Sequence, residues 1–354
     1  MIYLQAITPG DLVQAVSGIT LQEARKIVSA VHRFGFLPAS IRLTRRTSVE
    51  AVRAAGSIPS LAIQGVYRSE VDPFVKYVLE TPDKLSIEAV RIPLEHSQRF
   101  SACVSSQVGC ALACAFCATG KTGLRRNLES WEIIEQVRSI KCDLDPAKRQ
   151  RLHGIVFQGM GEPLANLNNV TNAIRVLREP CALAIDGRNI TVCTSGIPDG
   201  ILRLAEEAPS ARLAISIGSP RPEIRAKLMP VSRVFPLEAV LAASAEHARR
   251  TRLAPMWAMT LLGGINDTVE DARLLAKLAL DFVKDTGIRP RISTIAFNPI
   301  APPGKEIFNP TNPEREQAFR RVFHGHGLAT HRRYSGGGDV NAACGQLACR
   351  ESGD

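Results

Sequence analysis

A strand-like run and three closely spaced cysteines stand side by side in the stretch Ala102-Cys-Val-Ser-Ser-Gln-Val-Gly-Cys110-Ala-Leu-Ala-Cys114-Ala-Phe-Cys117. The β-rich residues 102–108 predict a strand, and Gly109 marks the turn that ends it. The three cysteines therefore occupy a loop that leaves the end of a strand, a place where side chains are free to meet a ligand.

Strand-like runs followed by loops recur along the chain, with helical patterns between them. The six runs are Ala102–Val108, Gly154–Phe157, Asn189–Thr194, Ala211–Ile217, Met256–Leu261 and Ile292–Phe297. The helical patterns include Glu129–Ile140, Leu237–Arg249 and Val269–Lys284. This alternation predicts an α/β fold with parallel strands, and six units are too few to close an eight-stranded barrel. We therefore expect a partial (βα)6 barrel with its active site in the loops at the carboxyl ends of the strands.

The first 85 residues have a different texture, which predicts a small and mainly helical unit. Thr20-Leu-Gln-Glu23 is a capping-box pattern, and the apolar residues after it recur at helical spacing. Strand-like residues at 61–67 and 75–79 lead from this unit into the next region. We expect residues 1–85 to form an accessory domain and residues 86–354 to form the catalytic core.

The spacing C-x3-C-x2-C at Cys110, Cys114 and Cys117 predicts a metal centre. Three thiolates this close can bind three irons of a 4Fe–4S cluster and leave the fourth iron open to a substrate. A zinc site is one alternative, but zinc knuckles usually supply four ligands, and no second half of such a site is evident. The other alternative is that these are buried cysteines without a ligand. Burial alone would not require three cysteines within eight residues.

With these residues, the chain resembles the radical S-adenosylmethionine (SAM) superfamily, whose spacing often includes an aromatic residue before the last cysteine, as Phe116 stands here. Further motifs are similar to the methyltransferases that act on adenine C2 in ribosomal and transfer RNA (the RlmN group). A sister group acts on C8 of a ribosomal adenine (the Cfr group). The motifs are Cys103–Cys110, Arg126–Leu128, Gly159–Leu164, Asn298-Pro299 and Ala342–Leu347. The resemblance covers most of the chain, and it implies a radical SAM barrel.

The resemblance implies that the enzyme methylates an adenine ring carbon, C2 in the first place, using a 4Fe–4S cluster and two SAM molecules per turnover. Cys344 would take a methyl group from one SAM, and a radical made from the second SAM would remove a hydrogen atom from that methyl group. The carbon radical would add to adenine and tether the RNA to the protein. Cys103 would release the product by forming a transient disulfide with Cys344. A radical route is reasonable because adenine C2 and C8 are electron-poor carbons.

Each of these roles has a plainer alternative. Cys344 and Cys103 can be read as small buried residues, since free cysteine is commonly buried. The resemblance also assigns proton removal from the attacked carbon to Glu88, in the segment Ile87-Glu-Ala-Val-Arg-Ile-Pro93. The alternative for Glu88 is an ordinary carboxylate on a strand.

The resemblance assigns SAM binding to Gly161, Glu162, Cys193, Ser216, Ile217, Gly218 and Asn298. Glu162 would pair with the ligand ammonium and Gly161 would allow a close backbone approach, while a structural turn is the alternative for both. Two positions depart from the family, which commonly has serine in place of Cys193 and histidine in place of Gly218. A thiol is a weaker hydrogen-bond partner than a hydroxyl, and glycine offers no imidazole. The amino-terminal unit also lacks the usual family pattern, so the RNA target stays open.

The composition fits a polyanionic partner. The 354 residues include 44 Lys and Arg against 34 Asp and Glu, for a formal net charge of +10. This excess favours contacts with RNA phosphates, although charge alone does not separate RNA from DNA or from an acidic protein. Nine cysteines without a signal peptide or a long apolar run predict a cytoplasmic protein with no membrane segment. We also expect a monomer that receives electrons from a donor such as flavodoxin or ferredoxin.

Two other functions remain open from the sequence. A radical SAM enzyme that acts on another substrate would keep the three cluster cysteines but would have no need of Cys103 and Cys344. An RNA-binding or electron-transfer protein could retain the cluster without turnover. Methylation at C8 in place of C2 is a third alternative, within the same chemistry.

Overall fold

The computed structural model describes residues 2–96, 98–300 and 307–348. Within them, ten strands form one sheet in the order β14-β13-β12-β11-β10-β9-β6-β5-β4-β3. Neighbouring strands are parallel from β6 to β14, while β5, β4 and β3 extend the sheet with antiparallel pairs. The α/β fold with a mainly parallel sheet is therefore confirmed.

Each of the six predicted strands is present, and a seventh parallel strand is added at the edge of the sheet. The parallel strands are β6 (Arg99–Val104), β9 (Arg151–Phe157), β10 (Ile190–Thr194), β11 (Arg212–Ser216), β12 (Met256–Leu261), β13 (Arg291–Ala296) and β14 (Thr330–Arg332). The antiparallel strands are β3 (Ala62–Arg68), β4 (Val75–Glu80) and β5 (Ser86–Pro93). The strand β14 escapes prediction because it has three residues, none of them a buried apolar one.

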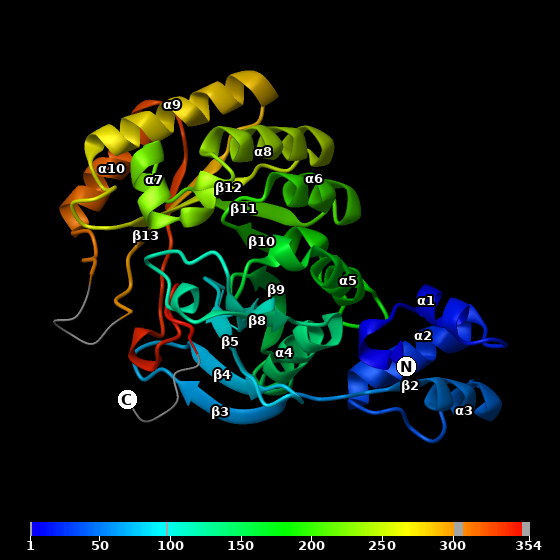
Figure 1. Cartoon of the computed structure of the whole chain (residues 1–354). Coiled ribbons are helices and arrows are strands. Elements are labelled where there is room, and N and C mark those ends of the chain that lie inside the picture. Colours follow the sequence, from blue (N-terminus) through cyan, green and yellow to red (C-terminus); the bar gives the residue numbers. More distant parts are fainter. Residues whose placement is uncertain (1, 97, 301–306, 349–354) are drawn as a thin grey trace.

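Helices connect the parallel strands and cover the outer face of the curved sheet (Figure 1). They are α4 (Ser130–Cys142), α5 (Leu167–Arg178), α6 (Pro198–Glu207), α7 (Pro222–Leu228), α8 (Leu237–Thr251), α9 (Val269–Thr286) and α10 (Pro313–Gly325). Local sequence sets their ends, as α9 illustrates. Thr268 and Asp271 form a reciprocal capping box at its start, and Gly287 ends it with a left-handed φ of 71°.

The predicted strand 102–108 is divided in two, and the division shapes the cysteine loop. After β6 the chain turns at Ser105, whose N–H donates to Gln136 Oε1 (2.8 Å). The next strand, β7 (Gln107–Cys110), leaves the large sheet and pairs with β8 (Gly123–Asn127) as a two-stranded antiparallel hairpin. Gly109 sits at a bulge with φ of 76°, where a Cβ would lie 1.8 Å from Gly123 O. Only glycine allows the two strands to meet this closely.

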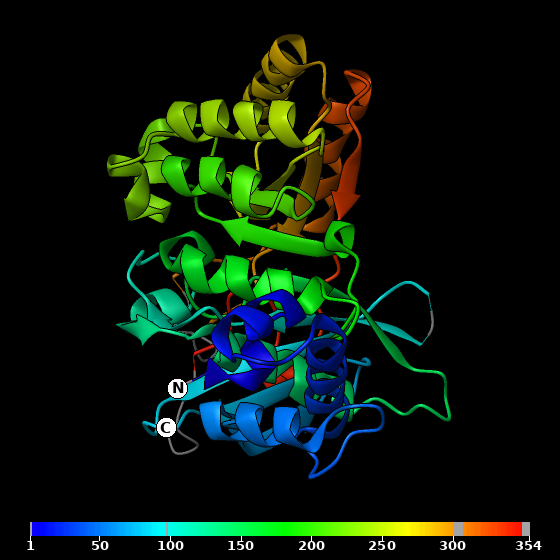
Figure 2. The same cartoon turned by 90° about the vertical axis from the view of Figure 1, so that its right-hand side faces the viewer.

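The amino-terminal unit is helical and has its own apolar core. Its elements are β1 (Ile2–Tyr3), α1 (Pro9–Ala15), α2 (Leu21–Phe34), α3 (Arg46–Ala55) and β2 (Gly56–Ser57). The capping box that the sequence predicts at Thr20 is formed. The unit packs beside α4 and α5 (Figure 2), where Tyr3 and Trp131 place their ring centroids 5.6 Å apart and Asp11 pairs with Arg175 at 2.9 Å.

The helical unit ends earlier than residue 85. The strands β3 and β4 cover residues 62–80, and they are hydrogen-bonded to the large sheet through β5. Backbone pairing therefore assigns them to the barrel side, although they precede residue 86 in the sequence. No helix among the described residues is long and apolar enough to cross a membrane.

Candidate active site

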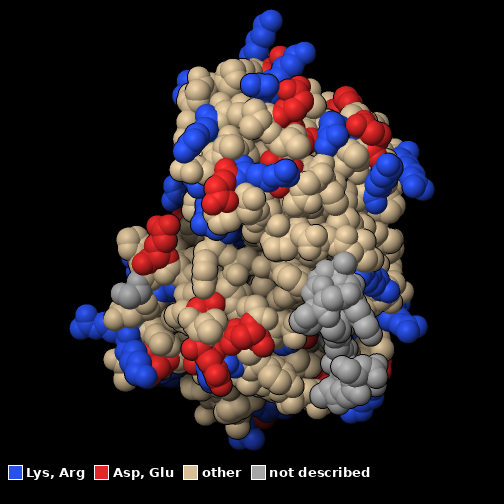
Figure 3. Space-filling model, turned by 90° about the vertical axis from the view of Figure 1, so that its left-hand side faces the viewer, with Lys and Arg blue, Asp and Glu red and all other residues tan. Residues whose placement is uncertain are grey.

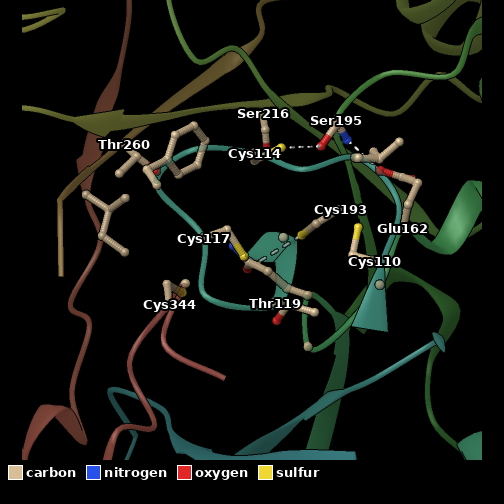
Figure 4. Close-up of a pocket in the computed structure, with 18 of the residues that line it drawn as sticks. Cys110, Cys114, Cys117, Thr119, Glu162, Cys193, Ser195, Ser216, Thr260 and Cys344 are labelled. Carbon is tan, nitrogen blue, oxygen red and sulfur yellow. Dashed lines mark hydrogen bonds between the residues drawn. The ribbon is translucent and has the colours of Figure 1, made fainter. Parts of the chain in front are cut away.

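The cysteine loop, residues 110–119, begins at the last residue of β7 and leads toward β8, the second strand of the hairpin, which starts at Gly123. Cys110 ends β7 and is paired with Gly123, which fixes the base of the loop. Cys117 N–H donates to Cys114 O (3.1 Å), and Ala115 N–H donates to Leu228 O (2.9 Å). The three cysteines line one space, which is the cluster cavity, and Figure 4 shows them around it.

Three thiols on one cavity wall fit an iron–sulfur cluster better than a single metal ion. Among the described residues, no group of three or more His, Cys, Asp or Glu side chains is placed to hold one ion. A 4Fe–4S cluster needs no such group, because each cysteine binds a different iron and the sulfurs stand further apart. Burial raises the pKa of the Cys110 thiol to about 11 and that of Cys114 to about 12. Burial alone thus favours the neutral thiols, whereas the positive charge of bound iron would favour the thiolates.

The cluster cavity encloses about 890 Å³, part of it open to solvent. Its wall is built from the carboxyl ends of five consecutive parallel strands, as expected for a barrel enzyme. The wall residues include Gln158 after β9, Thr194 of β10, Ser216 of β11, Thr260 of β12 and Ala296 of β13. The molecular face in Figure 3 is hollowed near its middle.

Glu162 places a buried carboxylate at the wall of the cluster cavity. Its Oε2 accepts from Ser195 N–H (2.8 Å), and its Oε1 accepts from Leu164 N–H (3.0 Å). Burial raises the pKa of Glu162, and these two N–H groups oppose the shift. Gly161 has a φ of 96°, and a Cβ there would lie 2.5 Å from Gln107 Cβ. A carboxylate has acceptor sites beyond these two bonds, so Glu162 can also bind a ligand ammonium.

Five of the seven residues assigned to SAM line the cluster cavity, and two do not. Gly161, Glu162, Cys193, Ser216 and Asn298 belong to its wall. Ile217 is fully buried in the apolar core of the barrel. Gly218 has a φ of 71°, and a Cβ there would lie 2.5 Å from Met229 Sδ. Met229 therefore occupies the space that a histidine side chain would need at this position.

Cys193, which stands where the family commonly has serine, makes one weak hydrogen bond in the cavity wall. Its thiol donates to Gln158 Oε1 at 3.6 Å. Two residues further along, Ser195 Oγ lies 3.9 Å from Cys114 Sγ. A hydroxyl is thus present near the cluster cysteines two residues after Cys193, although the position of Cys193 itself offers only a thiol.

Asn298 connects the cluster cavity to the carboxy-terminal segment, residues 333–348. Its Nδ2 donates to Ser335 Oγ (2.9 Å) and to Cys344 O (3.0 Å). Cys344 N–H donates to the same Ser335 Oγ (3.1 Å). Both backbone polar groups of Cys344 are therefore held, and the amide NH₂ of Asn298 is occupied by protein.

The carboxy-terminal segment also lies directly against the cysteine loop. Ala118 N–H donates to Gly345 O (2.7 Å), and the Thr119 hydroxyl donates to Leu347 O. These bonds bring Cys344 to the wall of the cluster cavity, across from Cys110 and Cys114 in Figure 4. Residues far apart in sequence thus form one site, as the motif pattern predicts.

Cys344 also lines a second space of about 450 Å³, which is the small cavity. Cys103 of β6 opens into this space from the other side and is 7% exposed. Burial raises the pKa of the Cys103 thiol. Both cysteines are free thiols, and no disulfide is present among the described cysteines. The two cavities share Cys344, Gly345 and Gln158.

Glu88 lies on β5 and is outside the walls of both cavities. Its Oε1 pairs with Lys76 Nζ at 3.2 Å, and both side chains are buried. Its Oε2 accepts from Ala348 N–H (2.9 Å). The carboxylate therefore fixes the chain just after the Cys344 motif, and the structure does not bring it to either thiol.

Two arginines at the site have no motif around them and were not predicted. Arg225 of α7 is 1% exposed and donates to Ile217 O (2.9 Å) and Ser195 O (2.8 Å), so it ties the loops after β10 and β11 together. Burial lowers its pKa to about 10. Arg333 lines the small cavity. A single arginine in a loop gives no sequence signal, and only the fold shows what it contacts.

Comparisons with known proteins agree with this geometry. Residues 104–279 match the family model described as the radical SAM superfamily. A probable RNA methyltransferase of Sorangium cellulosum is 55% identical over 347 residues, covering 94% of this chain and 88% of the relative. The dual-specificity RNA methyltransferase RlmN of Syntrophobacter fumaroxidans is 44% identical over 272 residues, covering 77% and 75%.

A solved structure extends the likeness to nearly the whole chain. The crystal structure of a radical SAM methyltransferase from Sphaerobacter thermophilus has a TM-score of 0.85 and 30% identity, covering 98% of this chain and 99% of that one. The relatives are named RNA methyltransferases, and the solved structure is that of a radical SAM methyltransferase. These names agree with a chain that has the cysteine loop, the strand-end cavity and the thiols of Cys103 and Cys344. This chain belongs to the family of RlmN-type radical SAM RNA methyltransferases.

Proposed function

We propose that this enzyme methylates C2 of an adenine in ribosomal or transfer RNA through a methyl group carried on Cys344. The observation that carries the proposal is the position of Cys344, which lines the cluster cavity on one side and the small cavity with Cys103 on the other. A residue at this boundary can receive a methyl group from SAM and present it to a base without leaving its place.

The chain's residues have separate tasks in this proposal. A 4Fe–4S cluster held by Cys110, Cys114 and Cys117 would supply the electron that splits SAM into a radical. Glu162 would bind the SAM ammonium, and the strand ends would enclose the ligand and exclude water. Two SAM molecules are used per turnover, one as methyl donor to Cys344 and one as radical source. Electrons would come from a donor such as flavodoxin or ferredoxin in the cytoplasm.

Product release is the task of Cys103. The radical adduct must first lose one electron, for which the oxidised cluster would be the acceptor, and its ring proton. The Cys103 thiolate then attacks the Cys344 sulfur, so that an S–S bond forms and the bond between that sulfur and the methylene carbon breaks. The electron pair goes to the methylene carbon, which takes up a proton and becomes the methyl group. A thiol reductant then restores both cysteines. The resemblance assigns removal of the ring proton to Glu88, whose carboxylate is paired with Lys76 in this structure.

The amino-terminal unit offers a surface for RNA outside the target adenine. A groove of about 1240 Å³ contains Arg25, Arg33 and Arg42, together with the half-exposed rings of Phe34 and Phe36. Cations beside exposed rings suit a nucleic-acid strand, which brings phosphates and stacking bases together. Substituting Arg25 and Arg42 by alanine should weaken RNA binding several-fold and reduce its salt dependence.

The direct test is transfer of a deuterated methyl group from SAM to RNA by anaerobically reduced enzyme. Digestion of the RNA and mass spectrometry with C2- and C8-methyladenosine standards identify the carbon. Cys344→Ala should abolish transfer while leaving the iron content unchanged. Normal methylation by that variant would refute the proposed mechanism, and product at C8 would replace C2 in it.

A further inference from the structure

Arg333 reaches the small cavity from the edge of the sheet. It directly follows β14, and its N–H donates to Thr294 O (2.8 Å) of β13, which holds its backbone in strand register. The preceding Arg332 pairs with Glu316 at 3.1 Å and is largely exposed. Consecutive residues of an extended chain point to opposite faces, so these two arginines have different surroundings.

Arg333 is the one charged side chain among the described residues that line the small cavity. Its guanidinium has neither an ion pair nor a hydrogen bond with any described residue, whereas a partly buried arginine ordinarily has a carboxylate partner. Cys103 and Cys344 line the same cavity, and the thiols of Cys344, Cys193 and Cys103 are close enough to raise the pKa of Arg333. They come from the carboxy-terminal segment, β10 and β6.

The charges of this group depend on one another. Burial raises the pKa of Cys103. The nearby thiols of Cys344 and Cys193 raise that pKa further, and Arg333 lowers it. Burial also raises the pKa of Cys193 to about 12, again against Arg333, while Cys344 and Glu162 add to the rise. Burial lowers the pKa of Arg333, but the three thiols raise it and the net shift is upward. The cation and the thiolates therefore stabilise each other.

We propose that Arg333, which lines the small cavity together with Cys103 and Cys344, is a positioning residue that raises the fraction of Cys103 in its thiolate form for attack on Cys344. The inference rests on the proposed function, because the attack is its product-release step. The thiolate is the nucleophile, and a cavity wall of apolar residues and neutral thiols would suppress it. A guanidinium stays charged at every pH that the enzyme meets, so its support of the thiolate does not vary with pH.

The test measures how fast Cys103 is alkylated as the pH is raised, in the anaerobic holoenzyme without RNA or SAM. Iodoacetamide is the probe, and peptide mass spectrometry reads the modification at Cys103. Arg333→Met should shift the profile upward by about one pH unit, which means roughly tenfold slower alkylation of Cys103 at each pH below its pKa. Arg333→Lys keeps the charge and should restore most of the rate. Arg332→Met removes an equal charge one residue away and should leave the profile unchanged.

An unchanged Cys103 profile in a folded Arg333→Met protein, with a normal melting temperature, would overturn the inference. So would a variant whose only defect is a higher KM for RNA, because that result would assign Arg333 to a phosphate. In turnover, Arg333→Met should accumulate a covalent protein–RNA adduct and lower kcat while KM stays the same. If the wild-type enzyme transfers no methyl group, the proposed function fails, and the alkylation profile still decides whether Arg333 supports the Cys103 thiolate.

Discussion

The two cavities that meet at Cys344 differ in their walls. The cluster cavity is framed by the ends of five parallel strands and contains the three clustered cysteines and the carboxylate of Glu162. The small cavity has a mainly apolar wall with Cys103 and a single cation, Arg333. In the proposed mechanism, radical generation belongs to the cluster cavity and product release to the small cavity. Cys344 is the one thiol that both spaces share among the described residues.

Cys110 lines the cluster cavity and not the small cavity, and its removal should have the largest effect. Cys110→Ala should abolish iron binding and methyl transfer, because three irons need three thiolates. Iron per chain and methylated RNA measure both effects. Cys142→Ala, at an exposed cysteine, is the matched control and should behave as wild type. Full activity in Cys110→Ala would exclude the cluster from the chemistry.

The complementary change removes a residue of the small cavity. Cys103→Ala should keep its iron and accept a methyl group on Cys344, yet release product at least about a hundredfold more slowly, because nothing attacks the Cys344 sulfur. Denaturing gels of the reaction with labelled RNA should show the trapped adduct. Free methylated RNA at the normal rate would remove Cys103 from the scheme.

Asn298 tests whether the two cavities depend on a common support. Asn298→Ala loses two hydrogen bonds, to Ser335 and to the Cys344 backbone, each contributing about 1 kcal/mol. We expect roughly a tenfold fall in kcat with iron content unchanged, since misplacing Cys344 affects the steps on both sides. A loss of iron in place of turnover would mean that Asn298 supports the loop and not Cys344.

Glu88 should give the smallest effect if it acts as a support. Glu88→Gln keeps an acceptor for Ala348 N–H but leaves Lys76 without its charge partner, so we expect a loss of about 1–3 kcal/mol in unfolding free energy and less than about a tenfold fall in kcat. Urea unfolding and single-turnover rates measure the two. A fall of more than about a hundredfold at unchanged stability would instead establish Glu88 as the proton acceptor.

Regular patterns made the barrel predictable from the sequence. The strand runs are rich in apolar and β-branched residues, most of which are buried or partly buried, and caps such as Thr268 carry a local chemical signal. The strand β14 and the division of 102–108 into two strands were not predicted. Both depend on distant partners, since β14 needs β13 and the turn at Ser105 needs Gln136 on α4. Pattern alone does not report such contacts.

At the site, the sequence motifs predicted which loops form the cavity wall, but they did not predict where each side chain points. Ile217 and Gly218 follow β11 as expected, but one side chain enters the core and the other position is closed by Met229. Ser216, one residue earlier, does face the cluster cavity. Arg225 and Arg333 were missed because a lone arginine has no period or spacing. Their importance comes from what surrounds them in three dimensions.

The bond between the cysteine loop and the carboxy-terminal segment also has a consequence for the order of events during synthesis. Thr119 and Leu347 are 228 positions apart, so the ribosome makes the loop long before its cover. Contacts of such separation form late in folding. The loop therefore stays uncovered until the last residues emerge. That interval would leave the three cysteines accessible to an incoming cluster before the carboxy-terminal segment packs against their loop.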